Sequence, residues 1–376
     1  MSRPAGPLTG DAWLLFVTRF IRLFAYGALS VVLVLYLVAI GINEADVGLL
    51  LTGTLIGDTV VSLALSSRAD RVGRRRALIL GALLMAAAGL VFASTHLWWL
   101  LLLAGIVGII SPSGHEVGPF LPIEQAALAQ VVNDRRRTQV FAWYAFTGSI
   151  ATALGSPAGG TIVQTLQGPS TAPADAYRSV VLLYVGLGAI LAFIFARLSH
   201  DLEPPSSHAA DRPGLLAVLS GVHRSRTTVW KSSALFALDS FGGGFVVQGF
   251  TAYWFHLRFG LDPGALGLLF LGANLLAGCS ALLAARLAAR IGLINTMVAT
   301  HLPSNILLIL VPLMPTLPLA VVVLLLRFGI SQMDDRPRPV SPAWRGRSAP
   351  PSIQSSPARS LPDPSGWTFR SSSPEG

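Results

Sequence analysis

Charged residues are scarce in this sequence: they make up 12% of its 376 positions, whereas soluble globular domains carry about 25%. Hydrophobic residues account for 52%, and the mean hydropathy is +0.62. A soluble fold this poor in charge could not cover its surface, whereas a chain immersed in lipid needs no such cover. The composition therefore excludes a string of soluble domains and predicts a membrane protein.

Lysine and cysteine are almost absent. Lys231 is the only lysine, so the net charge of +9 comes from arginines, which form short clusters between apolar runs. Because these clusters do not form one basic face or arm, we predict no nucleic-acid partner. Cys279 stands alone in an apolar run, which excludes an intramolecular disulfide and favours an inert thiol.

Motifs for enzymatic chemistry are also missing. We find no nucleophile–base set, no metal-ligand spacing and no Gly-Lys-Ser/Thr loop that would cradle a phosphate. The sequence therefore predicts neither an enzyme nor an ATP-driven pump, and we expect no cofactor and no metal.

Long apolar runs are abundant instead. A helix needs about 20 apolar residues to cross the hydrocarbon core. Ten segments qualify as predicted spans: 12–40, 45–66, 77–95, 97–118, 138–165, 178–198, 232–257, 265–285, 293–313 and 317–333. The first is too long for a signal-peptide core, so we expect it to be retained. The pattern predicts an all-α polytopic membrane protein.

The basic residues between these spans predict an orientation. With the N-terminus in the cytoplasm, fifteen arginine and lysine residues fall in inside segments, and only Arg178 and Arg258 fall outside. Cytoplasmic loops carry such an excess of positive charge. We therefore expect a multi-pass protein of the cell (inner) membrane, in contact with the lipid bilayer, monomeric and with a cytoplasmic N-terminus.

Two parts of the chain resemble each other at an offset of 219 residues. The matches pair Gly41 with Gly260, Gly48-Leu49-Leu50-Leu51 with Gly267-Leu268-Leu269-Phe270, Gly53 with Gly272, and Arg71-Val72-Gly73 with Arg290-Ile291-Gly292. Repeated helical halves with a substrate site at the membrane midplane are typical of secondary transporters. The predicted organisation is a six-helix bundle over 1–198, a polar linker over 199–231, a partial bundle over 232–334 and a disordered tail over 335–376.

The loop between the second and third spans carries the most specific motif. Residues 66–76 read Ser-Ser-Arg-Ala-Asp-Arg-Val-Gly-Arg-Arg-Arg. This resembles the signature loop of the major facilitator superfamily, G-x-x-x-D-R-x-G-R-R/K, with Ser66 in place of the leading glycine. The matching residues are Asp70, Arg71, Gly73, Arg74 and Arg75. The resemblance implies a conformational latch; a solvated turn would explain the arginines but not Asp70 together with Gly73.

A weaker resemblance lies in the fifth span, where residues 155–160 read Gly-Ser-Pro-Ala-Gly-Gly. Antiporters of the superfamily often carry G-P-x-x-G-G there, and here the proline comes one place late. Small residues also allow close helix packing. Both interpretations remain open at this point.

Ionisable residues within apolar spans are expensive and so are candidates for a functional site. Arg19 and Arg22 lie on one face of the first span, where they could bind an anion, pair with a carboxylate or reach the interface. Asp58 lies in the middle of the second span, where it could carry a proton or pair with Arg22.

The end of the fourth span holds three prolines and two glycines, and these residues must interrupt a regular helix. His115 and Glu116 lie among them. Irregular backbone at membrane depth is tolerated where it lines a cavity. Glu116 is thus our best candidate for a proton or substrate ligand, with an inner-loop cap as the alternative. Glu124 and Gln125 are expected to face the cytoplasmic loop. In the second half, Gln248 could contact substrate, and Asp239 could face the cavity or cap a helix.

These features predict a secondary transporter that works by alternating access, coupled to protons and exporting a small organic molecule. Two alternatives stay open: a facilitator or importer without ion coupling, and a non-transporting membrane protein.

Residues 335–376 are rich in proline, arginine and serine and contain no apolar run. The resemblance implies twelve spans, of which the eleventh engages the aspartate of the signature loop, so Asp70 would lack its partner. A frameshift near codon 335 is one explanation, and a genuine disordered tail is the other. The nucleotide sequence tests this: if no other reading frame past codon 335 encodes two apolar helices, the frameshift hypothesis is wrong.

Overall fold

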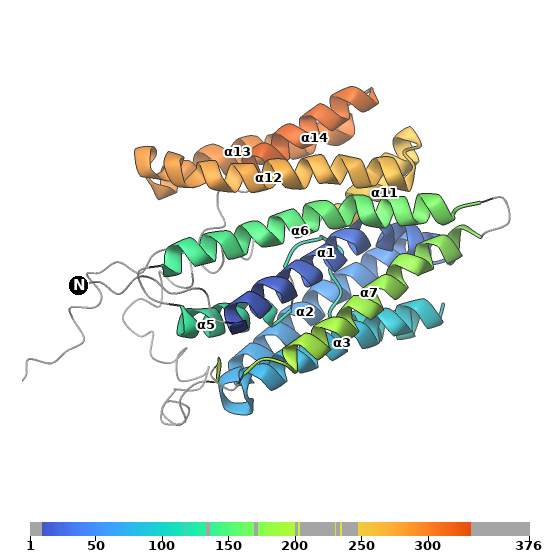
Figure 1. The fold of residues 1–376 in the computed structure, drawn as a ribbon. Helices are drawn as coiled ribbons and strands as arrows, with labels where there is room; N and C mark the ends of the chain where they lie inside the picture. The colour runs from blue at the N-terminus through green and yellow to red at the C-terminus, as the bar shows by residue number, and fades with distance from the viewer. Residues whose placement is uncertain are drawn as a thin grey trace, which may run out of the picture. The chain divides into compact units, whose positions relative to one another are not determined.

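The computed structural model describes residues 10–116, 118–132, 136–168, 172–199, 202–203, 230, 234 and 247–331, and their regular elements are all helical. The elements are α1 Gly10–Ala39, α2 Glu44–Val72, α3 Arg74–Ser94, α4 Trp98–Val107, α5 Phe120–Val131, α6 Arg137–Leu166, α7 Pro173–Phe195, α11 Gln248–Phe259, α12 Pro263–Ile291, α13 Leu293–Leu310, the 3-10 turn η2 Val311–Leu313 and α14 Leu317–Ser331 (Figure 1).

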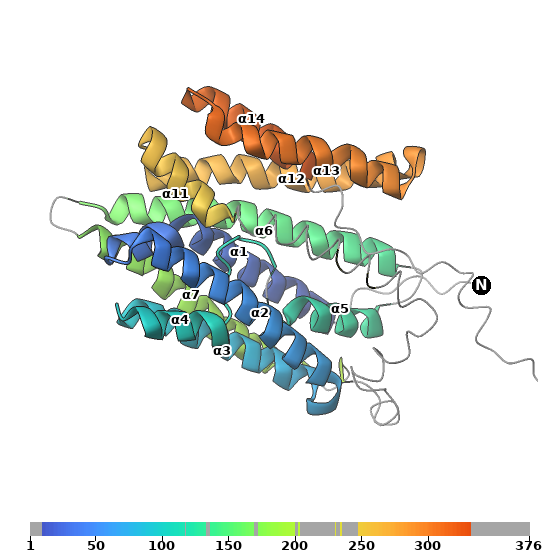
Figure 2. The ribbon, with the colours of Figure 1, turned by 180° about the vertical axis from the view of Figure 1, so that it is seen from behind.

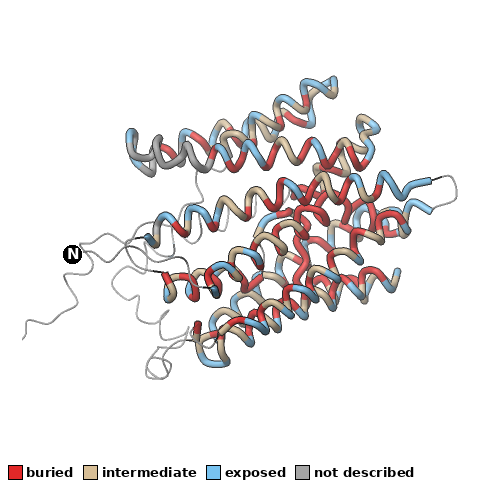
Figure 3. The backbone as a smooth tube through the Cα atoms, viewed as in Figure 1, coloured by how far each residue is buried: buried red, intermediate tan, exposed pale blue. Residues whose placement is uncertain are grey.

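Five of the described helices are long and apolar enough to cross a membrane: all of α1, α2, α3 and α7, and residues Pro263–Ser280 of α12. α1 is the most enclosed of them, and its tube is buried along most of its length (Figure 3). The prediction of an all-α polytopic membrane protein is therefore confirmed. Residues 1–335 and 336–376 are separate units, and the second unit, the linker residues 204–229 and Asp239 lie outside the described residues.

The predicted fourth span, 97–118, is not one helix. α4 ends at Val107, residues 108–116 and 118–119 have irregular backbone, and α5 begins a second helical segment at Phe120. The predicted interruption is confirmed, but the helical restart was not foreseen. Pro119 at the N-cap of α5 and Pro122 in its first turn are compatible with a helix start, since the first-turn amides have no intrahelical acceptor.

The 219-residue repeat is reproduced by the helix boundaries. α2 spans Glu44–Val72 and α12 spans Pro263–Ile291, so both helices have 29 residues and start and end at the same offset. Gly73 and Gly292 follow them with φ of 108° and 84°, a region that glycine occupies without steric penalty. The next helices, α3 and α13, again begin at matching positions.

Packing within the two parts repeats as well. A Cβ on Gly53 would meet Ile106 of α4, and a Cβ on Gly272 would meet Leu325 of α14, the residue at the same offset from Ile106. α2 packs on α4 as α12 packs on α14. The second part is thus built on the plan of the first.

Helix α6 packs against α1 on one side and α12 on the other, which both ribbon views show (Figures 1 and 2). Its small residues make this possible. A Cβ on Gly155 would lie 2.1 Å from the carbonyl oxygen of Phe24, and one on Gly160 would lie 2.1 Å from that of Pro263. The Gly-Ser-Pro-Ala-Gly-Gly segment therefore packs the two parts of the chain through α6.

Replacing Gly155 tests this packing. We expect Gly155→Ala to destabilise the protein by about 1–3 kcal/mol, because its methyl group would overlap the backbone of α1. Thermal unfolding in detergent measures the effect. Gly186→Ala in α7 is the matched control, since nothing lies within 4 Å of its Cβ position. Equal melting temperatures for the two variants would contradict the close approach of α6 and α1.

Candidate functional site: a buried arginine–glutamate cluster

Arg22 of α1 is fully buried and is held by a carboxylate on another helix. Its Nη1 and Nη2 donate to Oε1 and Oε2 of Glu124, both at 2.7 Å. Glu124 lies on α5, has no exposed surface, and also accepts hydrogen bonds from Thr18 at 3.2 Å and from the Tyr144 hydroxyl. A bidentate arginine–carboxylate pair with further donors is the arrangement that a buried charge requires.

Glu116 binds the remaining donors of the arginines from the irregular segment 108–119. Its Oε2 accepts from Nη1 of Arg19 at 2.9 Å, and its Oε1 accepts from Nε of Arg22 at 2.9 Å and lies 2.7 Å from Nη2. The Glu116 side chain is 15% exposed, whereas those of Arg22 and Glu124 are not exposed at all. Two arginines and two glutamates make the cluster electrically neutral.

Aromatic rings hold both guanidinium groups in place. Arg19 lies over the ring of Tyr144 at 4.4 Å from its centroid, and Arg22 lies over that of Phe120 at 4.6 Å. A cation over a ring face is attracted by the ring quadrupole, more strongly where water is excluded. Aromatic rings of α5 and α6 therefore fix the guanidinium groups that α1 carries.

Sequence reasoning found part of this cluster. It singled out Arg22 and Glu116, which the structure brings together. The alternative in which Arg19 and Arg22 reach the interface is wrong, because both are buried and ion-paired. The expectation that Glu124 faces the cytoplasmic loop is also wrong. Its signal was indirect: two buried arginines need two carboxylates, and sequence reasoning named only Asp58 as a possible partner of Arg22.

Asp58 is not the partner of Arg22. It lies on α2 beside the backbone amide of Gly118, and Ser62, one turn further along α2, donates to the Gly118 carbonyl at 3.0 Å. The Oδ1 atom of Asp58 is buried and has no hydrogen-bond partner in the described part of the chain. Asp58 thus lies next to the irregular segment that carries Glu116, but outside the ion-pair cluster.

Gln248 lies in a second polar cluster. The side chain, on α11, is 5% exposed, and its Nε2 donates to Ser30 of α1 at 2.9 Å and to Ser156 of α6 at 3.4 Å. Asn274 of α12 also donates to Ser156, at 3.5 Å. The amide nitrogen of Gly249 donates to the carbonyl of Pro112 at 3.1 Å. Gln248 therefore joins the second part of the chain to α1, α6 and the irregular segment.

The signature loop is tied together locally. Asp70, in the last turn of α2, pairs with Arg74, the first residue of α3, at 2.9 Å across the Gly73 turn. The backbone amides of Arg74 and Arg75 donate to the carboxylate of Glu203 at 2.7 and 3.2 Å, so Glu203 caps the N-terminus of α3. Asp70 thus has a partner within the loop, while the loss of a contact with an eleventh helix stays a prediction. Gly73 makes the turn, and Arg71 lies in the last turn of α2.

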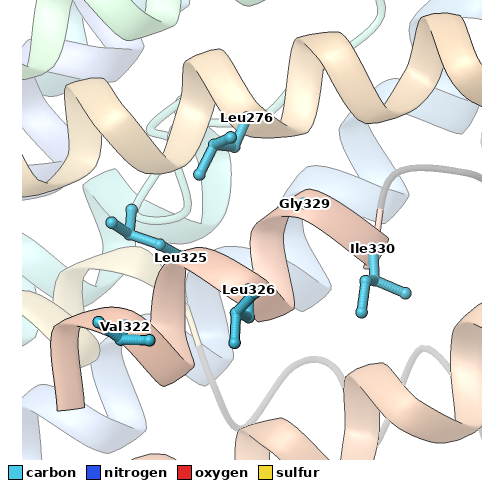
Figure 4. A pocket seen from close by; sticks show the side chains of 6 residues that line it. All are labelled: Leu276, Val322, Leu325, Leu326, Gly329 and Ile330. Carbon is cyan, nitrogen blue, oxygen red and sulfur yellow. The ribbon is translucent and has the colours of Figure 1, made fainter. Parts of the chain in front are cut away.

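A separate cavity of about 300 Å³ lies between α12 and α14 (Figure 4). Its lining is apolar: Leu276, Val322, Leu325, Leu326, Gly329 and Ile330. None of these residues belongs to either polar cluster, so the ionic chemistry of the protein lies elsewhere.

With this geometry in place, the chain can be compared with known proteins. The family model of the Major Facilitator Superfamily matches residues 15–334. The chain belongs to this superfamily. It is 32% identical over 356 residues to the Uncharacterized membrane protein YJR124C of Saccharomyces cerevisiae, covering 88% of this chain and 80% of the yeast protein.

Two further similarities fit the same family. The Quinolone resistance protein NorA of Staphylococcus aureus is 23% identical over 190 residues, covering 50% of this chain and 45% of NorA. The crystal structure of a D-xylose-proton symporter superposes with a TM-score of 0.61 at 15% identity, covering 86% of this chain and 79% of the symporter. The superfamily member described here therefore has the fold of a membrane transporter.

The charge balance of the cluster makes a prediction for Glu124. We expect Glu124→Gln to destabilise the protein by about 3–5 kcal/mol, because it removes the buried partner of a buried guanidinium. Thermal unfolding in detergent measures this. The control is Asp175→Asn, which breaks an exposed pair with Arg178 at 3.6 Å and should change stability by less than about 1 kcal/mol. Similar effects of the two substitutions would argue against a structural role for the Arg22–Glu124 pair.

Proposed function

We propose that this superfamily member is a proton-coupled secondary transporter that exports a small organic molecule by alternating access. The observation that carries the proposal is the position of Glu116. It is a partly exposed carboxylate on irregular backbone between two helical segments, and it is bound by two buried arginines of α1, a helix long and apolar enough to cross a membrane. Intramembrane carboxylates in such settings serve as proton relays in transporters.

A proton on Glu116 would change the interactions between elements. Loss of its charge weakens the ion pairs to Arg19 and Arg22, which hold the segment 108–119 against α1. The same segment accepts the amide of Gly249 on α11 through Pro112, so its movement would reach the second part of the chain. Asp58, with a buried and unpaired Oδ1 among the described residues, provides a second proton acceptor beside it.

The signature loop has a complementary role in this proposal. Asp70, Arg74 and Glu203 link α2, α3 and the residues after α7 on one end of the helices. These contacts would act as the latch that holds one of the two conformations, with the N-terminus in the cytoplasm of the cell. Export as the direction and protons as the coupling ion remain parts of the proposal, as does the monomeric state.

Flux measurements in proteoliposomes test the coupling. A pH difference of one unit is worth about 1.4 kcal/mol per proton, which sustains about a tenfold concentration ratio of a substrate coupled one for one to protons. We expect accumulation of the substrate found in a transport screen to follow the pH gradient. Glu116→Gln should abolish this dependence while substrate exchange without a gradient persists.

Two outcomes would contradict the proposal. Equal flux with and without the gradient in the unmodified protein would indicate an uncoupled facilitator. Glu44→Gln is the matched control, because Glu44 lies at the start of α2, away from the cluster, where it accepts an exposed hydrogen bond from Tyr253. Loss of proton dependence in this control as well would show that the effect is not specific to Glu116.

A further inference from the structure

The arginines bind Glu116 through its carboxylate group, as they would bind the carboxylate of a small molecule. Both of its oxygens are occupied by guanidinium nitrogens of α1, Oε2 by Arg19 and Oε1 by Arg22. Glu124, by contrast, also receives hydrogen bonds from Thr18 and Tyr144 and is part of a closed network. The two glutamates therefore differ in how replaceable they are.

The backbone on either side of Glu116 can move it. Gly114 and Gly118 flank the residue with φ of 71° and 79°, a region in which other residues are strained. Glu124 lies within the hydrogen-bonded α5 and has no such freedom. Only Glu116 can leave the arginines without unwinding a helix.

Removing Glu116 would leave donors that need an acceptor. The Arg22–Glu124 pair is neutral by itself, so Arg19 would remain as an uncompensated charge with an exposed fraction of 8%. Its Nε already has no hydrogen-bond partner among the described residues. That atom faces the backbone of α6 at Gly148, where a Cβ would come within 2.8 Å. A buried, unpaired guanidinium strongly favours the binding of an anion.

We propose that Arg19 and Arg22 form an exchangeable carboxylate site, filled by Glu116 in the absence of substrate and by a carboxylate of the transported molecule once Glu116 has taken up a proton. The substrate class is therefore an organic monocarboxylate. The occupation of this site by a transported carboxylate rests on the proposed transport function, whereas the anion site itself does not. The loaded cluster holds one added proton and one added anion, so it stays neutral in both states. The proton and the monocarboxylate therefore cross in the same direction, and the outward gradient of the monocarboxylate itself drives its export.

Other ionisable groups also act on Glu116 and belong to the same equilibrium. They come from four helices: Arg19, Arg22 and Tyr26 of α1, Asp58 of α2, Glu124 of α5 and Tyr144 of α6. Of these, only the two arginines are cations, so they alone can take the carboxylate of a ligand.

Chemical rescue by acetate tests the site directly. Glu116→Ala retains Cβ and removes a CH2–COO⁻ group, which acetate replaces in size and charge. We expect sodium acetate at about ten times its dissociation constant to raise the melting temperature of this variant by about 2–4 °C, relative to sodium chloride at equal ionic strength. Neutral acetamide should have no such effect. If the variant is too unstable to purify, its folded yield with acetate against acetamide provides the same readout.

Three variants define the specificity of the rescue. Glu116→Gln carries a neutral side chain that stands in for the protonated glutamate, so acetate should stabilise it as well, and to the same extent at pH 5.5 and pH 7.5. Arg19→Gln in the Glu116→Ala background should weaken acetate binding about tenfold or more, because one charged donor is lost. Glu44→Ala, which removes an exposed glutamate outside the cluster, should not respond.

The outcomes separate the two proposals. Equal stabilisation of Glu116→Ala by acetate and by acetamide would overturn the carboxylate site, whatever the flux assays give. Rescue by acetate together with proton-independent flux would retain the site and overturn the coupling. In the unmodified protein, monocarboxylates should bind at least about tenfold more tightly at pH 5.5 than at pH 7.5, and their amides should show no such change. A reversed pH dependence would contradict the exchange with Glu116.

Discussion

A guanidinium enclosed in an apolar interior must be neutralised there, and Arg22 imposes this requirement on the whole first part of the chain. No residue near it on α1 supplies a negative charge, so carboxylates must come from elsewhere. Glu124 comes from α5 and Glu116 from the irregular segment before it. Their ion pairs with Arg22 hold α5 and this segment against α1. The interruption of the fourth span is therefore tied to the charge on α1: one continuous helix through 97–131 would not place Glu116 and Glu124 as they are.

The two parts of the chain share a backbone plan but not this chemistry. α12 and α14 repeat the packing of α2 and α4 at the same offset, including the glycine contacts to Ile106 and Leu325. α14, however, continues to Ser331, whereas α4 ends at Val107. An apolar cavity lies between α12 and α14, and Gln248 and Asn274 contribute polar side chains at the junction. The helix packing is thus repeated, whereas the arginine–glutamate cluster lies in the first part.

Features that depend on local sequence could be predicted. The all-helical membrane architecture follows from apolar length, the Gly73 turn from its motif, and the candidacy of Arg22 and Glu116 from the cost of burying charge. Features set by contacts distant in sequence could not. Glu124 was misplaced because the helical restart at Phe120 brings it to α1 over more than a hundred residues. Asp58 was paired with the wrong partner because depth in a span does not fix which neighbour a helix face meets.

The two carboxylates of the cluster lie on different kinds of backbone. On the proposals above, Glu124 on its helix would stabilise the fold, and Glu116 on irregular backbone would be the exchangeable ligand. A carboxylate within a helix is held by the main-chain hydrogen bonds on both sides of it, as Glu124 is in α5. Glu116 lies outside a helix, between two glycines with positive φ, and its ion pairs add to hydrogen bonds that Ser62 and Thr152 donate to the carbonyls of Gly118 and Gly114. On the proposed function, a proton on Glu116 would weaken the contacts of this segment rather than those of a helix. Because the segment also contacts α11 through Pro112, that proton would alter the contact between the two parts while Arg22 and Glu124 keep the fold intact.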